Sequence, residues 1–199
     1  RCRRSVAERA RHAAILAGGM GSRLGGAKPQ TLLAGRALID YPVAASVAAG
    51  LAPLVVAKLD TELPRSLLET DARVLLDPPG EAHPLLGIAT ALEHAAGPVV
   101  AIAGDMPFVT AALLARLAAL DGCVVLRDSD GRVQPLIGRY EPSALPILRA
   151  AIERGGSVRD AVGELGAVVE DAPEGAVLFD VDTPEDLAEA ERLLAESEV

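Results

Sequence analysis

The chain has 199 residues with a formal net charge of −9, and half of these residues are hydrophobic although only 2% are aromatic. The charge argues against general binding to nucleic acid or to an anionic membrane, because both need a basic surface. No apolar run reaches the ~18 residues that a membrane span needs. Cys2 and Cys123 form neither a metal-ligand spacing nor a disulfide framework, so we expect a reduced, cytoplasmic setting.

Short apolar runs alternate along the chain with longer stretches of helical pattern. The runs predicted to be strands are 13–17, 54–57, 73–76, 99–103, 123–126, 133–140, 167–170 and 177–181. The predicted helices are 38–49, 63–68, 85–96, 111–120, 143–154, a short one after Ser157 and a last one that begins at Pro184. Thr110, Ser157 and Thr183 are residue types that cap a helix N-terminus.

This alternation predicts a three-layer α/β/α fold around a mainly parallel, Rossmann-like sheet. Residues 1–11 are expected to be an N-terminal extension, and 12–199 a single domain. The extension is rich in arginine and lacks the apolar segment of a signal peptide, which leaves a transit peptide as an alternative. In such a fold the ligand lies beyond the carboxyl ends of the strands.

A glycine-rich loop follows the first predicted strand directly. Residues 16–29 have the sequence LAGGMGSRLGGAKP, in which Gly18, Gly19 and Gly21 can bring backbone N–H groups close to a ligand. Successive N–H groups form an anion nest, and Arg23 and Lys28 add positive charge to it. The loop therefore indicates a triphosphate site.

This loop does not match either of two common phosphate-binding motifs. A Walker A loop needs Ser or Thr after its lysine, but Lys28 precedes Pro29. A dinucleotide fingerprint needs glycine at the third position after Gly21, where this chain has Leu24.

An acidic loop follows the apolar run 99–103. Gly104, Asp105, Met106, Pro107 and Phe108 place one carboxylate just beyond a buried strand. A triphosphate brings Mg²⁺, which binds one or two carboxylates together with phosphate oxygens and water. Asp105 is therefore the expected Mg²⁺ ligand.

A second acidic group, Asp180 and Asp182, lies between the last predicted strand and the last helix. Asp182 is a candidate second ligand for Mg²⁺. It lies near a helix N-terminus, where negative charge is favourable, so support of that turn is the alternative.

The glycine loop resembles the signature loop of nucleotidyltransferases with the glycosyltransferase-A-like fold, and among them the chain most resembles the molybdenum cofactor guanylyltransferase family. The acidic loop is similar to the metal-binding loop of that family. The resemblance implies that Leu16, Ala17 and Gly18 help to hold the base, and that Lys28 contacts the phosphates. The predicted nucleotide-binding residues are Leu16, Ala17, Gly18, Gly19, Gly21, Ser22, Arg23, Lys28, Asp77 and Asp105, of which Arg23, Lys28 and Asp105 are predicted to be catalytic.

The same resemblance places Asp77 near guanine, whose N1–H and N2–H₂ groups can donate to a carboxylate, although a turn aspartate is the alternative. Arg139 lies in a segment similar to the one that closes over the acceptor, and it could bind the acceptor phosphate or be solvated. His83 could touch the acceptor or lie on the surface.

The implied reaction transfers GMP from GTP to the phosphate of molybdopterin or the molybdenum cofactor, with Mg²⁺ as cofactor and pyrophosphate as product. The protein would be a monomer or a weak homo-oligomer. Asp180, Asp182 and Lys58 stand where guanylyltransferases often have asparagine, which leaves CTP as the alternative nucleotide. A sugar-phosphate nucleotidyltransferase, a nicotinamide-dependent oxidoreductase and a non-catalytic nucleotide-binding protein are the remaining alternatives.

Overall fold

The computed structural model describes residues 8–17, 28–79 and 83–197. Its strands are β1 His12–Leu16, β2 Leu32–Leu33, β3 Arg36–Ala37, β4 Ala52–Ala57, β5 Arg73–Leu76, β6 Val99–Ala103, β7 Val124–Arg127, β8 Val133–Tyr140 and β9 Val168–Asp171. Its α-helices are α1 Asp40–Ala48, α2 Leu86–Ala95, α3 Ala111–Ala119, α4 Leu145–Glu153, α5 Val158–Glu164 and α6 Pro184–Ser197. Short 3-10 helices cover Lys28–Gln30, Arg65–Glu69 and Pro142–Ala144.

Seven strands form one sheet in the order β5-β4-β1-β6-β8-β7-β9. β8 runs antiparallel to both of its neighbours, β6 and β7, and the other pairings are parallel. This is the mainly parallel α/β sheet that the sequence predicts. The central strands β1 and β6 are almost entirely buried, as strands covered on both faces must be.

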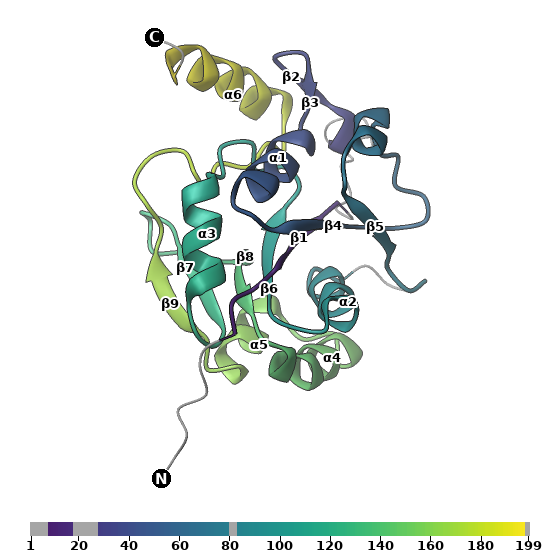
Figure 1. Ribbon diagram of the computed structural model, residues 1–199. Coiled ribbons are helices and arrows are strands. Elements are labelled where there is room, and N and C mark those ends of the chain that lie inside the picture. Colours follow the sequence, from purple (N-terminus) through teal and green to yellow (C-terminus); the bar gives the residue numbers. More distant parts are fainter. Residues whose placement is uncertain (1–7, 18–27, 80–82, 198–199) are drawn as a thin grey trace.

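Helices cover both faces of the sheet (Figure 1). One apolar cluster joins the sheet to α1 and α3, and a second joins it to α2, α4 and α5. The side chains are mostly Ala, Val, Leu and Ile, so the layers interlock without large aromatic groups.

Three helix caps predicted from local sequence are confirmed. Thr110 accepts a hydrogen bond from the Leu113 N–H at 3.2 Å, and Ser157 accepts one from Asp160 at 3.1 Å. At α6, Thr183 and Asp186 form a reciprocal capping box in which each side chain accepts from the other's N–H.

The predicted strand 177–181 is wrong. This segment crosses the carboxyl edge of the sheet without a strand partner, and Phe179 N–H bonds to Ala176 in a turn. Its apolar residues are covered by two different clusters. Val177 and Leu178 pack against the cluster between the sheet and α1 and α3, whereas Phe179 and Val181 pack with the β2–β3 hairpin and α6. Apolar character shows that a segment is covered but does not reveal by what.

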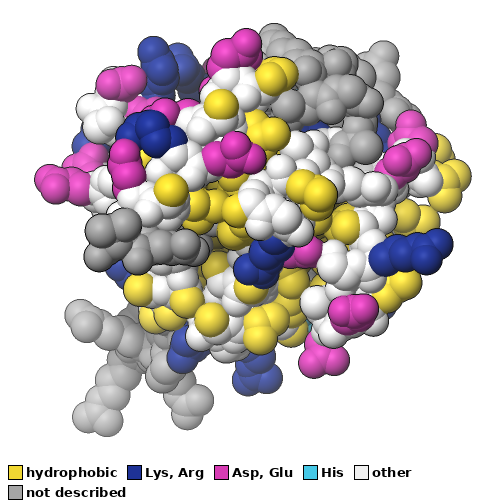
Figure 2. Space-filling model, turned by 90° about the horizontal axis from the view of Figure 1, so that it is seen from above, with side chains coloured by type: hydrophobic (Ala, Val, Ile, Leu, Met, Phe, Trp, Pro, Cys, Tyr) yellow, Lys and Arg dark blue, Asp and Glu magenta, His cyan; other side chains and the backbone are white. Residues whose placement is uncertain are grey.

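Figure 2 shows the molecule from above the view of Figure 1, with apolar side chains in the middle of this face and Asp and Glu side chains around them. Lys and Arg side chains of the described residues do not gather there into one basic patch. No helix in the described part of the chain is long and apolar enough to cross a membrane.

Candidate active site

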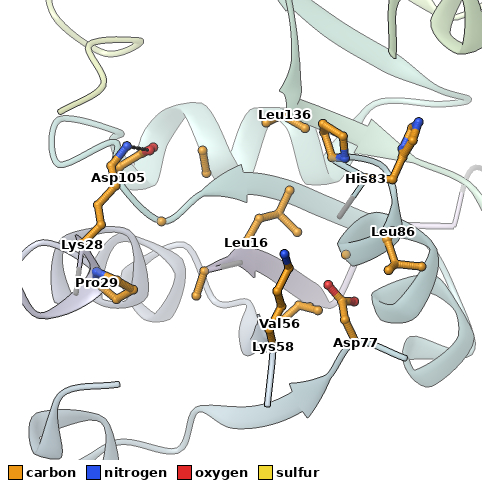
Figure 3. A pocket seen from close by; sticks show the side chains of 15 residues that line it. Leu16, Lys28, Pro29, Val56, Lys58, Asp77, His83, Leu86, Asp105 and Leu136 are labelled. Carbon is orange, nitrogen blue, oxygen red and sulfur yellow. Dashed lines mark ion pairs between the residues drawn. The ribbon is translucent and has the colours of Figure 1, made fainter. Parts of the chain in front are cut away.

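A pocket of about 300 Å³ lies at the carboxyl ends of β1, β4, β5 and β6. Its walls are largely apolar, and they include Leu16, Val56, Leu86 and Leu136. Charged side chains are confined to its two ends (Figure 3). Lys28 and Asp105 mark one end, and Lys58 and Asp77 mark the other. We call these the phosphate end and the base end, after the roles that the sequence resemblance implies for Lys28 and Asp77.

At the phosphate end, Lys28 bridges two carboxylates. Its Nζ lies 2.6 Å from Asp105 Oδ2, and it also pairs with Asp182 Oδ1. Burial of the ammonium lowers the pKa of Lys28, but Asp105 and Asp182 outweigh burial and hold this pKa above its usual value. Lys28 therefore stays charged while largely removed from water.

A small apolar cluster brings these three residues together. The cluster is built from the β2–β3 hairpin, the 176–182 segment and α6, and its buried members are Leu33, Leu38, Val181 and Ala190. Phe108 and Phe179 meet edge to face there with ring centroids 5.9 Å apart, which fixes the two acidic loops to each other.

A hydrogen bond between backbone groups also joins the loop that carries Asp105 to the segment that carries Asp182. The Val181 N–H donates to the Asp105 carbonyl at 3.1 Å, so Asp182 follows a residue that is already anchored beside Asp105. Lys28 enters from the other side, at the start of the chain segment that leads into the hairpin.

One carboxylate oxygen at this end lacks a partner. Asp105 Oδ1 is buried and accepts no hydrogen bond from any described residue. Asp180 lies close enough that burial, Asp105 and Asp182 together raise the pKa of its carboxyl. An unsatisfied buried oxygen beside a second carboxylate suits a hard divalent cation, although no group of three potential metal ligands occurs among the described residues.

The carboxylate of Asp182 does not support the turn before α6. Asp186 performs that task, because its Oδ2 accepts hydrogen bonds from the N–H groups of Asp182 and Thr183. The Asp182 side chain is left half-exposed and directed to Lys28. Sequence reasoning left both roles open for Asp182, and the geometry favours the one toward the phosphate end.

At the base end, Asp77 and Lys58 follow β5 and β4. The Thr90 hydroxyl on α2 donates to Asp77 Oδ1 at 2.7 Å. Burial raises the pKa of the Asp77 carboxyl, against the opposing effects of this hydrogen bond and of the Lys58 ammonium. Asp77 is thus a wall residue of the pocket and not merely a turn residue before two prolines.

His83 lines the pocket with both ring nitrogens engaged. Its Nδ1 accepts from the Leu85 N–H at 3.2 Å, and its Nε2 lies 2.9 Å from the Gly156 carbonyl. The first bond leaves the proton on Nε2, so the ring donates to Gly156 and joins the pocket to the start of α5. His83 is therefore held in place and only partly exposed.

Gly104 allows β1 and the end of β6 to approach closely. A Cβ at this position would lie 3.1 Å from the Leu16 carbonyl oxygen, to which the Gly104 N–H donates at 3.0 Å. This contact keeps the Asp105 loop against the end of β1.

Five predicted nucleotide-binding residues, Gly18, Gly19, Gly21, Ser22 and Arg23, lie outside the described residues, as do residues 1–7 of the predicted N-terminal extension. The other five, Leu16, Ala17, Lys28, Asp77 and Asp105, all line the pocket. The structure thus brings together side chains that the sequence places in three separate segments.

Arg139 does not reach the pocket, so its suggested role at the acceptor phosphate is wrong. Its side chain is fully buried at the amino-terminal edge of the sheet. It donates to the carbonyls of Glu8, Ala118 and Gly122 and pairs with Glu141. β8 runs antiparallel to β6, so Arg139 near the end of β8 pairs with Val100 at the edge of the sheet opposite the pocket, and the sequence of one strand does not reveal its direction in the sheet.

Sequence reasoning missed one residue that lines the pocket, Lys58, and one that lies behind it, Thr90. Lys58 was noticed only as a departure from the family pattern, and Thr90 was not noticed at all. Thr90 is a buried hydroxyl on the apolar face of α2, and such a residue must find a hydrogen-bond partner. That requirement is the signal that could have led to Asp77.

A pocket at the carboxyl edge of an α/β sheet, with a lysine and two carboxylates at one end, can hold a nucleoside triphosphate with its metal ion, as a nucleotidyltransferase requires. Comparison with known proteins agrees, since residues 13–189 match the family described as the MobA-like NTP transferase domain. The chain belongs to this family. The oxidoreductase alternative is therefore wrong.

Individual relatives agree with the family. A molybdenum cofactor guanylyltransferase of Bradyrhizobium sp. (strain ORS 278) is 33% identical over 91% of this chain and 92% of its own. The molybdopterin-guanine dinucleotide biosynthesis protein A of Archaeoglobus fulgidus superposes with a TM-score of 0.78 at 27% identity, over 93% of this chain and 99% of that one. A 2-C-methyl-D-erythritol 4-phosphate cytidylyltransferase of Thermus thermophilus shares the fold, with a TM-score of 0.65 at 24% identity over 92% and 98% of the two chains.

Proposed function

We propose that this nucleotidyltransferase transfers GMP from GTP to the terminal phosphate of molybdopterin or the molybdenum cofactor and releases pyrophosphate. The observation that carries the proposal is the two-ended pocket, which has room for a base between apolar walls and a cation bridged by carboxylates where phosphates would lie. The names of its relatives supply the guanylyl group and the acceptor.

In this proposal the residues of the phosphate end position the triphosphate. Lys28 donates to phosphate oxygens and offsets the charge that develops on the leaving pyrophosphate. The acceptor phosphate is already ionised at neutral pH, so the reaction needs no general base and depends on alignment and charge neutralisation.

Mg²⁺ is the proposed cofactor, and the residues present suit it. The unpartnered Oδ1 of Asp105 and the carboxylate of Asp182 would be its protein ligands, and phosphate oxygens and water would complete the shell. A metal held there would polarise the α-phosphate and help to neutralise the leaving group.

Pyrophosphate release tests the proposal directly. Purified protein is incubated with molybdopterin or molybdenum cofactor and Mg²⁺, in parallel with GTP, CTP, ATP and UTP. Release with GTP supports the guanylyl assignment, and absence of release with all four nucleotides contradicts the acceptor assignment. Nucleotide binding without pyrophosphate release on any phosphorylated acceptor would favour the non-catalytic alternative.

CTP is the second candidate nucleotide for one specific reason. Asp180, Asp182 and Lys58 replace residues that are often asparagine in guanylyltransferases. Release with CTP and not with GTP would transfer the assignment to cytidylyl transfer.

A further inference from the structure

The base end of the pocket holds one acid and one cation at matched positions of neighbouring strands. β4 and β5 are parallel, and their last residues, Ala57 and Leu76, are in register, so Lys58 and Asp77 are the residues that directly follow the two strands. The Asp77 N–H donates to the Ala57 carbonyl at 2.9 Å, which extends this pairing into the loop. Both side chains point into the pocket from the same edge of the sheet (Figure 3).

These two opposite charges face each other without forming an ion pair. Among the described residues, no acidic oxygen lies within 4.0 Å of the Lys58 ammonium, although Lys58 is close enough to affect the pKa of Asp77. A cation and a carboxylate that share a pocket across a gap can each bond to a ligand placed between them.

Thr90 fixes the orientation of the acid. Its side chain is 4% exposed, and its hydroxyl occupies Asp77 Oδ1, which leaves Oδ2 available to a ligand. Since α2 carries Thr90 and also packs against Leu16, one helix sets both the floor of the pocket and the direction of the carboxylate. The packing there is close, because a Cβ on Gly87 of α2 would lie 2.8 Å from Leu16 Cδ2.

The ligand that fits this pair carries a hydrogen-bond acceptor next to donors on a flat apolar body. A carboxylate only accepts and an ammonium only donates. Guanine presents two adjacent donors, N1–H and N2–H₂, beside the acceptor O6. Cytosine and adenine each offer only one donor group on this edge, and uracil has its one donor between two acceptors.

We infer that Lys58 is a specificity residue that donates to O6 of guanine, while Asp77, positioned by Thr90, accepts from the N1–H and N2–H₂ groups. This inference rests on the proposed function and deepens it, since it derives the base from side chains of this chain and not from the names of relatives. Lys58 stands where the family often has asparagine, and the inference explains this difference as a contact to guanine and not as a sign of a cytosine site.

Equilibrium binding by calorimetry tests the inference without any acceptor. The ligands are GTP, ITP (which lacks the N2 amino group), 6-thio-GTP (whose sulfur is a weak acceptor), CTP and tripolyphosphate. Lys58→Met removes the ammonium and keeps the chain length, and Arg73→Met is the matched control, because it removes an exposed positive charge at the other end of β5.

Lys58→Met should weaken GTP binding roughly tenfold or more, the size expected for one hydrogen bond to a charged group. Its affinity for tripolyphosphate should not change, and Arg73→Met should bind GTP as the wild type does. The preference of the wild type for GTP over 6-thio-GTP should disappear in Lys58→Met, whereas the preference for GTP over ITP should remain.

Thr90→Val should show the complementary pattern, because it disturbs Asp77, the partner of the N1–H and N2–H₂ groups, and leaves Lys58 in place. It should reduce the preference for GTP over ITP, and Thr90→Ser should restore that preference. A merely structural role for Thr90 would weaken all the nucleotides equally.

Each of the other outcomes overturns the inference. Equal loss of GTP and tripolyphosphate affinity in Lys58→Met would make Lys58 a phosphate contact, and unchanged GTP affinity would remove it from the site. A wild type that binds CTP better than GTP would contradict the proposed guanylyl function itself, and the wild-type measurements alone would reveal this.

Discussion

Two cations removed from water, Arg139 and Lys28, lie at opposite edges of the same sheet. Arg139 is fully buried, and three backbone carbonyls and the Glu141 carboxylate accept its hydrogen bonds. Lys28 is held by the side chains of Asp105 and Asp182, and one oxygen of Asp105 has no partner among the described residues. A buried charge whose groups are all satisfied is a structural part of the fold that is costly to break, whereas incomplete satisfaction indicates a place for a ligand.

The largest expected effect is on turnover, and it follows from a substitution at Asp105, where the Lys28 site has an oxygen without a partner among the described residues. Asp105→Ala should reduce pyrophosphate release by on the order of 10³-fold, because it removes the proposed metal ligand and a partner of Lys28. The circular dichroism spectrum should not change, since Asp105 is not part of the apolar core. Asp60→Ala, at an exposed acid outside the pocket, is the matched control. Near-normal turnover in Asp105→Ala would remove this carboxylate from the mechanism.

At Arg139, whose hydrogen bonds are all made within the protein, a substitution should affect the stability of the fold and not the binding of nucleotide. Arg139→Met should lower the free energy of unfolding by about 3 kcal/mol, because it removes the partner of the partly buried Glu141 carboxylate and of three backbone carbonyls. Urea denaturation measures this loss. GTP affinity of the folded protein should equal that of the wild type, and a selective loss of nucleotide binding would contradict the contrast between the two cations.

A metal titration sharpens the comparison further. Lys28→Met should increase the affinity of the nucleotide-free protein for Mn²⁺ roughly tenfold, because the ammonium no longer competes for Asp105 and Asp182. Electron paramagnetic resonance of free Mn²⁺ measures this affinity without turnover. Arg116→Met, which removes a surface ion pair with Glu170, should leave it unchanged. Equal affinities in wild type and Lys28→Met would show that Lys28 does not occupy the metal position.

The smallest expected effect is a shift in the pH dependence of base recognition. Burial raises the pKa of Asp77 above the usual 3.8, and guanine requires the ionised form. The difference in affinity between GTP and tripolyphosphate should therefore be complete above this raised pKa and decline as the pH falls through it. Thr90→Val removes a bond that lowers the pKa, so its decline should begin at a higher pH. Identical profiles for wild type and Thr90→Val would contradict this coupling.

The sequence predicted correctly those features that depend on interactions between residues close together in the chain. The caps at Thr110, Ser157 and Thr183 depend on a side chain and an N–H three residues later, so the sequence contains both partners. Segment 177–181 could not be assigned in this way, since an apolar run is equally compatible with a strand and with a buried crossing loop. Arg139 shows the same limit, because the direction of β8 in the sheet, and hence the edge at which Arg139 lies, depends on the pairing of β8 with its neighbours.

The sequence by itself determined the alternation of strands and helices, the glycine loop, and the acids that follow buried strands, because each depends on residues close together in the chain. Only the tertiary structure decided that Lys28 lies between Asp105 and Asp182, the latter 154 positions away. It also decided that Lys58 faces Asp77 at the other end of the pocket and that Thr90 bonds to Asp77 from α2. The physical reason is that strand register and a small apolar cluster fix these distances, and both arise from packing between segments that are remote in sequence.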